Sequence, residues 1–558
     1  MPSILTPTAL WNEFDDSADL NAQIAGKKVV DGIVYEEVTF DGRETGAGRV
    51  KGFGVFASKE QNPSAETVLI FSDSAESVDE DILKLFVERG YSAFMVDYRG
   101  EWEGVEHKTV YPENIDYANT VKCGRRKDFV DETADKTSWY EWVALGVFAR
   151  KYIVERTGSE DIAVVGIRDG GEIAWKLAAA KKFSCIIPVC AAGWLAYSGI
   201  SKFKSDEQSL DSERYRFIAG IDSQAYAPYV QCPVMLLCSV NDYRLDSDRA
   251  YDTFSRINQE FAPESVIVYS VQCYSSIAME STADMFMYLD KYLKKRQVFI
   301  PKPVEVNVSV DGEQNLVAVA KFDNLGIVES SGMFFAEDCI DPSIRDWILC
   351  TNAEKISDNE RKFYLDIFEE TTTLFVLSYA TYSNGFTVWS KMAVKKISGR
   401  FKNTVGKCRV VYTSKNGVDG FYVADPCSLA VGGVFFTDSV MKPQVVAKAK
   451  GINGIYSVRG LTTYRLNSPR FAPNKDNLLK IDVFCDETSE ITFTIEDSAE
   501  KEVYKYSQSI IGGVWQSLIL ESKLFKTGNG VQLTDYAHNL RFCISCDGEY
   551  AVNNLMWL

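Results

Sequence analysis

The stretch from Asp161 to Trp175, DIAVVGIRDGGEIAW, runs from apolar residues straight into a glycine-rich turn. Residues 161–165 have the pattern of a buried strand, and the residues from Gly171 onward have that of a helix. A tight turn between a strand and a helix needs small residues, and Gly166, Gly170 and Gly171 supply them. Such a turn displays one residue between strand and helix, and that residue is Arg168.

Apolar strands alternate with helices over the first half of the chain. The runs typical of helices are 79–90, 136–158, 247–261 and 281–296, and the runs typical of strands are 66–73, 91–100, 161–166, 183–193, 232–240 and 264–272. This alternation predicts a mostly parallel sheet with helices on both faces. We place this α/β domain at residues 1–297.

The second half of the chain predicts all-β structure. A proline-marked linker at 297–303 is followed by short alternating strands. Residues 303–397 fit an immunoglobulin- or fibronectin-like β-sandwich, and residues 400–558 fit a jelly-roll sandwich. The expected fold class is therefore α/β plus all-β.

Charge and composition exclude several function classes. The 558-residue chain carries a net charge of −18, which argues against a nucleic-acid surface. No apolar run is long enough to span a bilayer, and the first 20 residues lack the pattern of a secretory signal. The 13 cysteines are scattered and read as free thiols, so a cytoplasmic protein is expected.

Two histidines, His107 and His538, limit the available chemistry. A zinc site built on several histidines is excluded, and no metal or other cofactor is expected. Cys543 and Cys546 form a CxxC motif within a strand pattern. Residues three apart on a strand point to opposite faces, so this motif predicts neither a metal site nor a redox dithiol.

Three motifs in the first 300 residues resemble the acetyl xylan esterase and cephalosporin-C deacetylase branch of the α/β-hydrolase fold. Arg99-Gly100-Glu101 is similar to that family's Arg-Gly-Gln motif, and GIRDGG at 166–171 resembles its Gly-x-Ser-Gln-Gly-Gly elbow. Residues 233–257 resemble the strand, acid loop and helix that supply the triad aspartate, which falls on Asp242. The resemblance implies an esterase fold with a Ser-Asp-His order of catalytic positions.

The chain departs from this pattern at two of the three catalytic positions. Arg168 stands where the family has its serine, and Tyr274 stands where it has its histidine. A serine hydroxyl needs an adjacent base, and a guanidinium stays cationic and cannot attack an ester. We therefore expect no conventional serine esterase chemistry.

Arg168 has three interpretations. It pairs with a nearby acid such as Asp242 as a relic, or it clamps a carboxylate or phosphate, or the site works by another route. Asp169 as nucleophile and His107 as base are the candidate substitutes. The further candidates for lining the pocket are Tyr98, Arg99, Glu101, Trp102 and Trp194.

Three functions follow from these alternatives. The first is an inactive or strongly degenerate carbohydrate-esterase homologue whose pocket binds a carbohydrate-like or anionic ligand. The second is an active acetyl esterase or deacetylase with relocated catalytic residues, and the third is a structural assembly protein. The expected partner is a small-molecule or carbohydrate ligand, with no nucleic acid and no membrane, and a homo-oligomer stays open. The jelly roll resembles carbohydrate-binding modules, which leaves sugar binding there open as well.

Overall fold

Contacts within the computed structural model divide the chain into two compact units. The first comprises residues 1–238, 244–269 and 280–300, and the second comprises 239–243, 270–279 and 301–558. The structure describes residues 4–74, 77–100, 105–118, 127–203, 210–242, 244–271, 273, 277–423, 443–458, 460–471, 478–497, 501–536 and 540–558. Three candidate residues, Glu101, Trp102 and Tyr274, lie outside the described residues.

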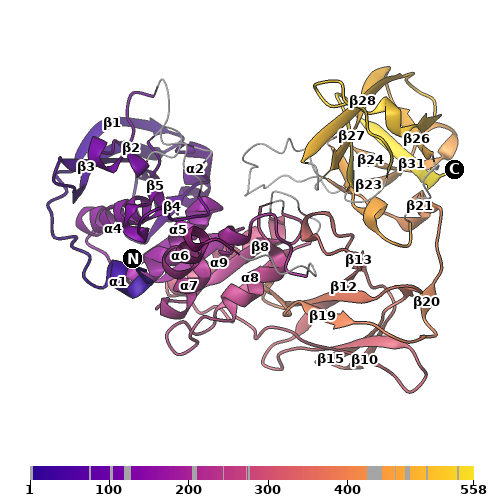
Figure 1. Ribbon diagram of the computed structural model, residues 1–558, viewed down its shortest axis with the longest axis horizontal. Helices are drawn as coiled ribbons and strands as arrows, with labels where there is room; N and C mark the ends of the chain where they lie inside the picture. Colours follow the sequence, from indigo (N-terminus) through magenta and orange to yellow (C-terminus); the bar gives the residue numbers. More distant parts are fainter. Residues whose placement is uncertain are drawn as a thin grey trace. The chain divides into compact units, whose positions relative to one another are not determined.

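A mixed sheet forms the centre of the N-terminal half (Figure 1). Its order among the described residues is β1-β2-β3-β5-β4-β6-β7-β8-β9. The strands are β1 (Gln23–Val30), β2 (Ile33–Glu44), β3 (Arg49–Lys59), β4 (Thr67–Phe71), β5 (Ser92–Asp97), β6 (Ile162–Ile167), β7 (Cys185–Val189), β8 (Met235–Ser239) and β9 (Val266–Ser270). Pairing is antiparallel from β1 to β5 through β2 and β3, and parallel from β5 through β4, β6 and β7 to β8.

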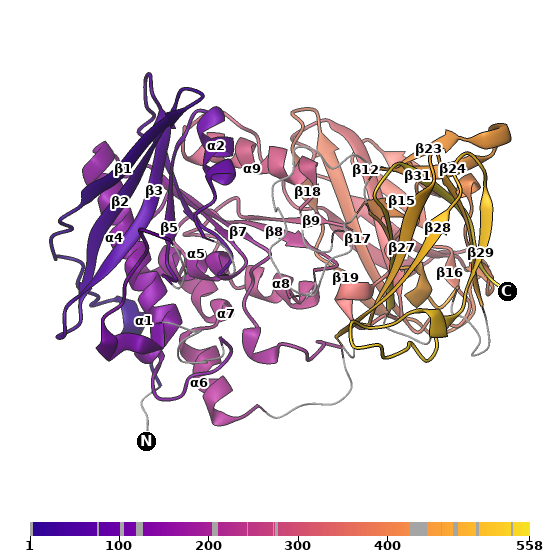
Figure 2. The same cartoon turned by 90° about the horizontal axis from the view of Figure 1, so that it is seen from above.

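Helices cover both faces of this sheet (Figure 2). They are α1 (Pro7–Trp11), α2 (Glu80–Glu88), α4 (Ser138–Thr157), α5 (Asp169–Ala180), α6 (Ser212–Gly220), α7 (Ser223–Tyr226), α8 (Ser247–Phe254) and α9 (Met279–Tyr292). On one face α2 packs on α9 through Phe86 and Phe286, whose rings lie 5.5 Å apart. On the other face α5 packs against α4. The mostly parallel sheet covered on both sides confirms the α/β-hydrolase fold predicted for this half.

Helix caps explain where these elements begin and end. Thr137, one of the two predicted caps, accepts a hydrogen bond from the amide of Tyr140 and starts α4. The run predicted as a helix over 247–261 is shorter, because α8 ends at Phe254. The side chain of Asn258 accepts the amide of Glu260, and the chain turns there before Pro263.

The second unit is all-β apart from short 3₁₀ turns in its described residues. One pair of sheets has the orders β10-β11-β15-β14 and β13-β12-β17-β18, with β19 on β17. Its strands are β10 (Glu305–Val310), β11 (Leu316–Lys321), β12 (Val328–Glu337), β13 (Ile348–Leu349), β14 (Ala353–Ser357), β15 (Glu360–Tyr364), β17 (Thr373–Tyr382), β18 (Thr387–Trp389) and β19 (Ala393–Lys396). A short parallel pair joins β16 (Ile367–Phe368) to β20 (Thr404–Val405).

A second pair of sheets follows in the chain. Its orders are β23-β24-β31-β26-β29, with β21 on β31, and β22-β25-β30-β27-β28. Its strands are β21 (Val410–Tyr412), β22 (Tyr422–Val423), β23 (Gln444–Ala447), β24 (Asn453–Ser457), β25 (Leu461–Thr463), β26 (Leu479–Cys485), β27 (Ser489–Asp497), β28 (Glu502–Ile510), β29 (Gln516–Leu520), β30 (Leu540–Cys546) and β31 (Tyr550–Trp557). One hydrophobic core lies between its sheets. The two pairs confirm the predicted sandwiches, while their boundaries at 303–397 and 400–558 stay predictions.

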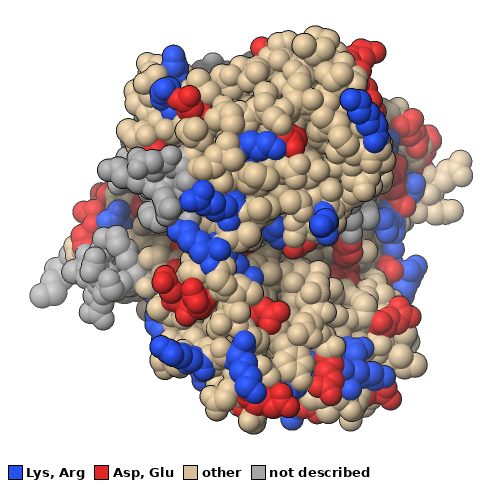
Figure 3. All heavy atoms as spheres, turned by 90° about the vertical axis from the view of Figure 1, so that its right-hand side faces the viewer, with Lys and Arg blue, Asp and Glu red and all other residues tan. Residues whose placement is uncertain are grey.

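On the face drawn in Figure 3, acidic and basic side chains are interspersed and separated by uncharged surface. Within the described part of the chain, no helix combines the length and the apolar character that a membrane crossing requires.

Candidate functional site

The turn between β6 and α5 has the backbone geometry of a nucleophile elbow. Arg168 stands between the two elements with φ 51° and ψ −113°, a conformation that ordinary residues avoid. A Cβ atom on Gly166 would lie 2.1 Å from the carbonyl oxygen of Gly170. A Cβ on Gly170 would lie equally close, 2.1 Å, to the carbonyl oxygen of Phe71. The elbow is therefore intact, with an arginine at the nucleophile position.

The guanidinium of Arg168 is buried against a carboxylate. Its Nε atom lies 3.8 Å from Oδ2 of Asp73, and the two side chains are 2% and 0% exposed. The pairing of neighbouring strands explains the contact. Phe71 of β4 pairs with Gly166 of β6. Asp73 and Arg168 each follow two positions later, so they lie side by side just beyond the two strands.

Arg244 joins the two carboxylates of the site. One of its terminal nitrogens lies 2.8 Å from Asp73 Oδ2, and the other lies 3.0 Å from Asp169 Oδ1. Its side chain is 37% exposed, so it stands at the outer edge of the site. This fork-like contact of one guanidinium with two carboxylates is a strong, charge-assisted arrangement.

Lys127 and Ser74 complete the polar cluster. The Lys127 ammonium donates to Asp169, and the Ser74 hydroxyl donates to the same carboxylate oxygen. Lys127 also contacts the Ser74 hydroxyl directly. Burial would raise the pKa of Asp169, but the charges of Arg244 and Lys127 and these hydrogen bonds hold it well below its ordinary value. Asp169 is therefore a permanent carboxylate and a weak base.

Little space remains in this site. The cavity has a volume of about 20 Å³, which is room for about one water molecule. Its lining consists of Arg168, Asp169, Glu172, Cys190, Gly193, Leu195, Arg244 and Leu245. Among the described residues, no group of three or more His, Cys, Asp or Glu side chains is placed to hold a metal ion.

A second polar cluster adjoins the same cavity through Glu172 and holds the loop after β7. Glu172 accepts the amide of Gly193, Gln224 accepts that of Trp194, and Asp222 accepts that of Leu195. Burial, and then the charge of Glu172, raises the pKa of Asp222 to about 7. Burial lowers the pKa of Lys176, whose ammonium donates to the Ser223 hydroxyl.

The two residues that directly follow β5, Tyr98 and Arg99, support the site. The Tyr98 hydroxyl donates to the carbonyl of Ser72 over 2.9 Å, and burial raises its pKa well above the ordinary value. The guanidinium of Arg99 donates to the carbonyl of Ser74. Both residues thus position the segment after β4, and neither lines the cavity.

Three further candidates do not line the cavity: Trp194, His107 and Asp242. The Trp194 indole donates to Thr253 of α8 over 3.0 Å, and the residues on either side of it, rather than Trp194 itself, line the cavity. His107 lies 3.9 Å from a Glu37 carboxylate oxygen and packs on Phe53. Asp242 is buried three residues after β8, and its amide donates to the carbonyl of Ser239. Neither His107 nor Asp242 lines the cavity.

Four residues of the site, Asp73, Ser74, Lys127 and Arg244, were not predicted. Two of them carried a usable signal, because Asp73 ends the predicted strand 66–73 and Ser74 directly follows it, and α/β folds place functional groups at the carboxyl ends of strands. Arg244 is two residues beyond the predicted acid position. Lys127 lies outside any helix or strand, and no local pattern points to it.

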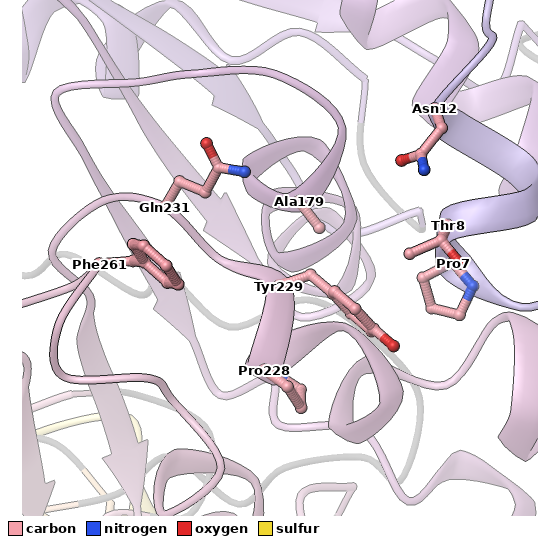
Figure 4. Close-up of a pocket in the computed structure, with 8 residues that line it drawn as sticks. All are labelled: Pro7, Thr8, Asn12, Ala179, Pro228, Tyr229, Gln231 and Phe261. Carbon is pink, nitrogen blue, oxygen red and sulfur yellow. The ribbon is translucent and has the colours of Figure 1, made fainter.

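A larger cavity of about 150 Å³ lies elsewhere in the first unit (Figure 4). It is lined by Pro7, Thr8, Asn12, Ala179, Pro228, Tyr229, Gln231 and Phe261, and the ring of Tyr229 extends toward Pro7 and Thr8. This lining contains no carboxylate, lysine, arginine or histidine. Of the side chains that serve as general acids or bases in enzymes, this lining supplies only the Tyr229 phenol.

Solved structures of esterases are similar to the N-terminal half of this chain. An acetyl xylan esterase from Paenibacillus sp. R4 is 16% identical over 51% of this chain and 92% of its own, with a TM-score of 0.38. Acetyl xylan esterase 1 from Thermoanaerobacterium sp. JW/SL YS485 is 13% identical over 53% and 95%, with a TM-score of 0.37. A cold-adapted esterase from an Arctic intertidal metagenomic library is 14% identical over 48% and 97%, with a TM-score of 0.32. No family model and no curated protein matches the chain.

Proposed function

We propose that the N-terminal unit is a non-catalytic relative of carbohydrate esterases that recognises an anionic, carbohydrate-like ligand at the mouth of the former active site. The observation that carries the first part is the elbow itself. It holds a buried, ion-paired arginine in the conformation that would otherwise present a nucleophile. A guanidinium supplies neither a nucleophile nor a base.

Ser74 supports the competing idea of a relocated esterase, because its hydroxyl touches both Asp169 and Lys127. The electrostatics oppose it. Asp169 is held as a weak base by two cations, and the Lys127 ammonium already donates to that carboxylate. Neither group is suited to take the proton of Ser74. The cavity also lacks room for an acyl group.

The anionic character of the ligand follows from the charges around the end of β4. Among the described residues, four cationic side chains contact Asp73, Ser74 or Asp169: Arg99, Lys127, Arg168 and Arg244. The carboxylates in these contacts are two, Asp73 and Asp169. Arg244 and Lys127 are 37% and 28% exposed and so can reach a ligand from the rim. Guanidinium and ammonium groups bind carboxylates and phosphates.

Hydrolysis of a small activated acetyl ester tests the loss of catalysis. The wild type and Arg168→Ala, Asp169→Ala and His107→Ala should all match the rate in buffer alone. A wild-type rate well above buffer that disappears in one variant would establish a relocated catalytic residue and reject the proposal.

Calorimetric titration with uronic-acid oligosaccharides and sugar phosphates tests ligand recognition, with neutral oligosaccharides of the same length as reference. We expect binding of the anionic series only, weakened about tenfold or more by Arg244→Gln and by added salt. Lys136→Gln, an exposed cation of the same unit, should leave binding unchanged. If no member of either series binds, the ligand part is wrong and a structural role is favoured.

A further inference from the structure

Two cysteines face each other in the last pair of sheets. Cys485 is the final residue of β26, and Cys546 is the final residue of β30. Along each strand the core-facing positions alternate with the others, and both cysteines fall on the core-facing series. Cys485 belongs to the hydrophobic core, and Cys546 packs against it.

The topology brings these strand ends together. The turn at 486–488 leads from β26 to β27, and the turn at 547–549 leads from β30 to β31, so both turns pass from one sheet to the other. Cys485 pairs with Tyr550 of β31, and Cys546 pairs with Ile491 of β27. The Cys546 thiol is close enough to Cys485 to raise the pKa of its thiol.

We propose that Cys485 and Cys546 form a reversible disulfide that joins the two sheets when the chain meets a small disulfide oxidant such as oxidised glutathione. Because Cys546 is partly exposed and Cys485 is buried, Cys546 is the thiol that reacts with the oxidant first. The Cys546 thiolate attacks one sulfur of the oxidant and releases one reduced glutathione. The Cys485 thiolate then attacks the Cys546 sulfur and releases the second. The protein loses two hydrogens, and one glutathione disulfide becomes two thiols.

The environment of Cys485 suits it to the second step. Burial, and then the neighbouring Cys546 thiol, raises the pKa of Cys485 to about 12. Its thiol is therefore unreactive toward oxidants in solution, and it reacts once Cys546 holds a mixed disulfide beside it. The bond would also close a long loop of the chain, which disfavours the unfolded state.

Three other described cysteines, Cys543, Cys185 and Cys232, lack this arrangement. Cys543, the partner of Cys546 in the CxxC motif, is buried on the opposite face of β30, and its sulfur contacts the Thr462 hydroxyl. Cys185 and Cys232 influence each other in the first unit, but both are buried, so an oxidant has no exposed thiol to attack. Cys485 and Cys546 differ from these three because one thiol is partly exposed and the neighbouring one is buried.

The test equilibrates the full chain with defined ratios of oxidised to reduced glutathione, then quenches with acid, alkylates and maps peptides by mass spectrometry. We expect a Cys485–Cys546 linked peptide that disappears with dithiothreitol. Cys485→Ser should leave Cys546 glutathionylated, and Cys546→Ser should leave Cys485 unmodified. Cys408→Ser, at an exposed cysteine, should leave the cross-link intact.

Limited proteolysis supplies a second readout. Oxidation should slow cleavage within residues 478–558 about tenfold or more in the wild type, and not in either serine variant at this pair. Two results would overturn the proposal. One is a wild type in which Cys546 accumulates as a glutathione mixed disulfide without the cross-link, and the other is a wild type in which both thiols stay fully alkylated under oxidising ratios.

Discussion

The Nε atom of Arg168 lies 3.8 Å from Oδ2 of Asp73, and both side chains are buried. The pair occupies the position where a hydrolase elbow would present its nucleophile. A buried ion pair is costly to break because removing one partner leaves the other charge without compensation. The relationship therefore makes the arginine a structural part of this unit, and its consequences can be measured.

The first prediction concerns the stability of this pair. Asp73→Ala should lower the free energy of unfolding of the first unit by about 3–5 kcal/mol, because Arg168 then loses a buried carboxylate partner. Hydrogen–deuterium exchange in β6 reports this energy for the unit itself. Glu132→Ala, which removes an exposed ion pair with Lys136, should leave exchange in β6 unchanged. Equal effects of the two variants would contradict the structural role of the pair.

The second prediction is that restoring a serine does not restore an esterase. Arg168→Ser places a hydroxyl at the elbow, but Asp169 stays paired with Arg244 and Lys127 and remains a weak base. The rate at which Arg168→Ser hydrolyses an activated acetyl ester should therefore stay within about tenfold of the wild-type rate. An increase of a hundredfold or more would show that a competent base is already in place.

The third prediction is a dependence of stability on pH through Asp222. Its pKa of about 7 in the folded state lies above the ordinary value of about 4 in the unfolded chain, so the folded protein binds the proton more tightly. This contribution is complete below about pH 4 and is lost as the pH rises to about 7, at a rate of up to about 1.4 kcal/mol per pH unit.

Urea unfolding of the wild type and Asp222→Asn at pH 5, 6, 7 and 8 measures the third prediction. The wild type should lose stability relative to the variant between pH 5 and pH 7, and then run parallel to it. Glu172 and Lys176 also face this carboxyl, so Glu172→Gln should reduce the slope by removing the like charge. Parallel curves over the whole range would show that Asp222 keeps an ordinary pKa.

The fourth prediction concerns the glycine frame of the elbow. Gly170→Ala should destabilise the first unit by about 3 kcal/mol or more, since the added Cβ meets the backbone carbonyl of Phe71 at 2.1 Å. Gly312→Ala adds a Cβ in open space and should melt like the wild type. Thermal unfolding followed by circular dichroism makes the comparison. A tolerated alanine at residue 170 would mean that the elbow is looser than its geometry indicates.

Much of the fold could be predicted because its signals are local. The start of α4 follows from the capping side chain of Thr137, and the elbow follows from glycines within six residues of one another. The end of α8 was predicted too late. The apolar pattern continued past Phe254, whereas the amides of Arg256 and Ile257 bond to carbonyls three residues back and so end the α-helical pattern.

The candidate site was only half predictable. Arg168 and Asp169 were found because a strand-turn-helix pattern surrounds them. Asp73 is 95 positions away from Arg168 in the chain, and it reaches the site because β4 lies next to β6 in the sheet. Strand order of this kind is decided by the packing of the whole sheet, so no local pattern carries it.

The sequence by itself determined which residue types stand where the resemblance places a serine and a histidine, namely Arg168 and Tyr274, and from these we expect no conventional serine esterase chemistry. Only the tertiary structure decided what replaces that chemistry. It neutralises Arg168 with Asp73, fixes Asp169 between Arg244 and Lys127, and reduces the cavity to the size of about one water molecule. The physical reason is that ion pairing and packing act over a few ångströms in space, between residues that folding brings together from distant parts of the chain.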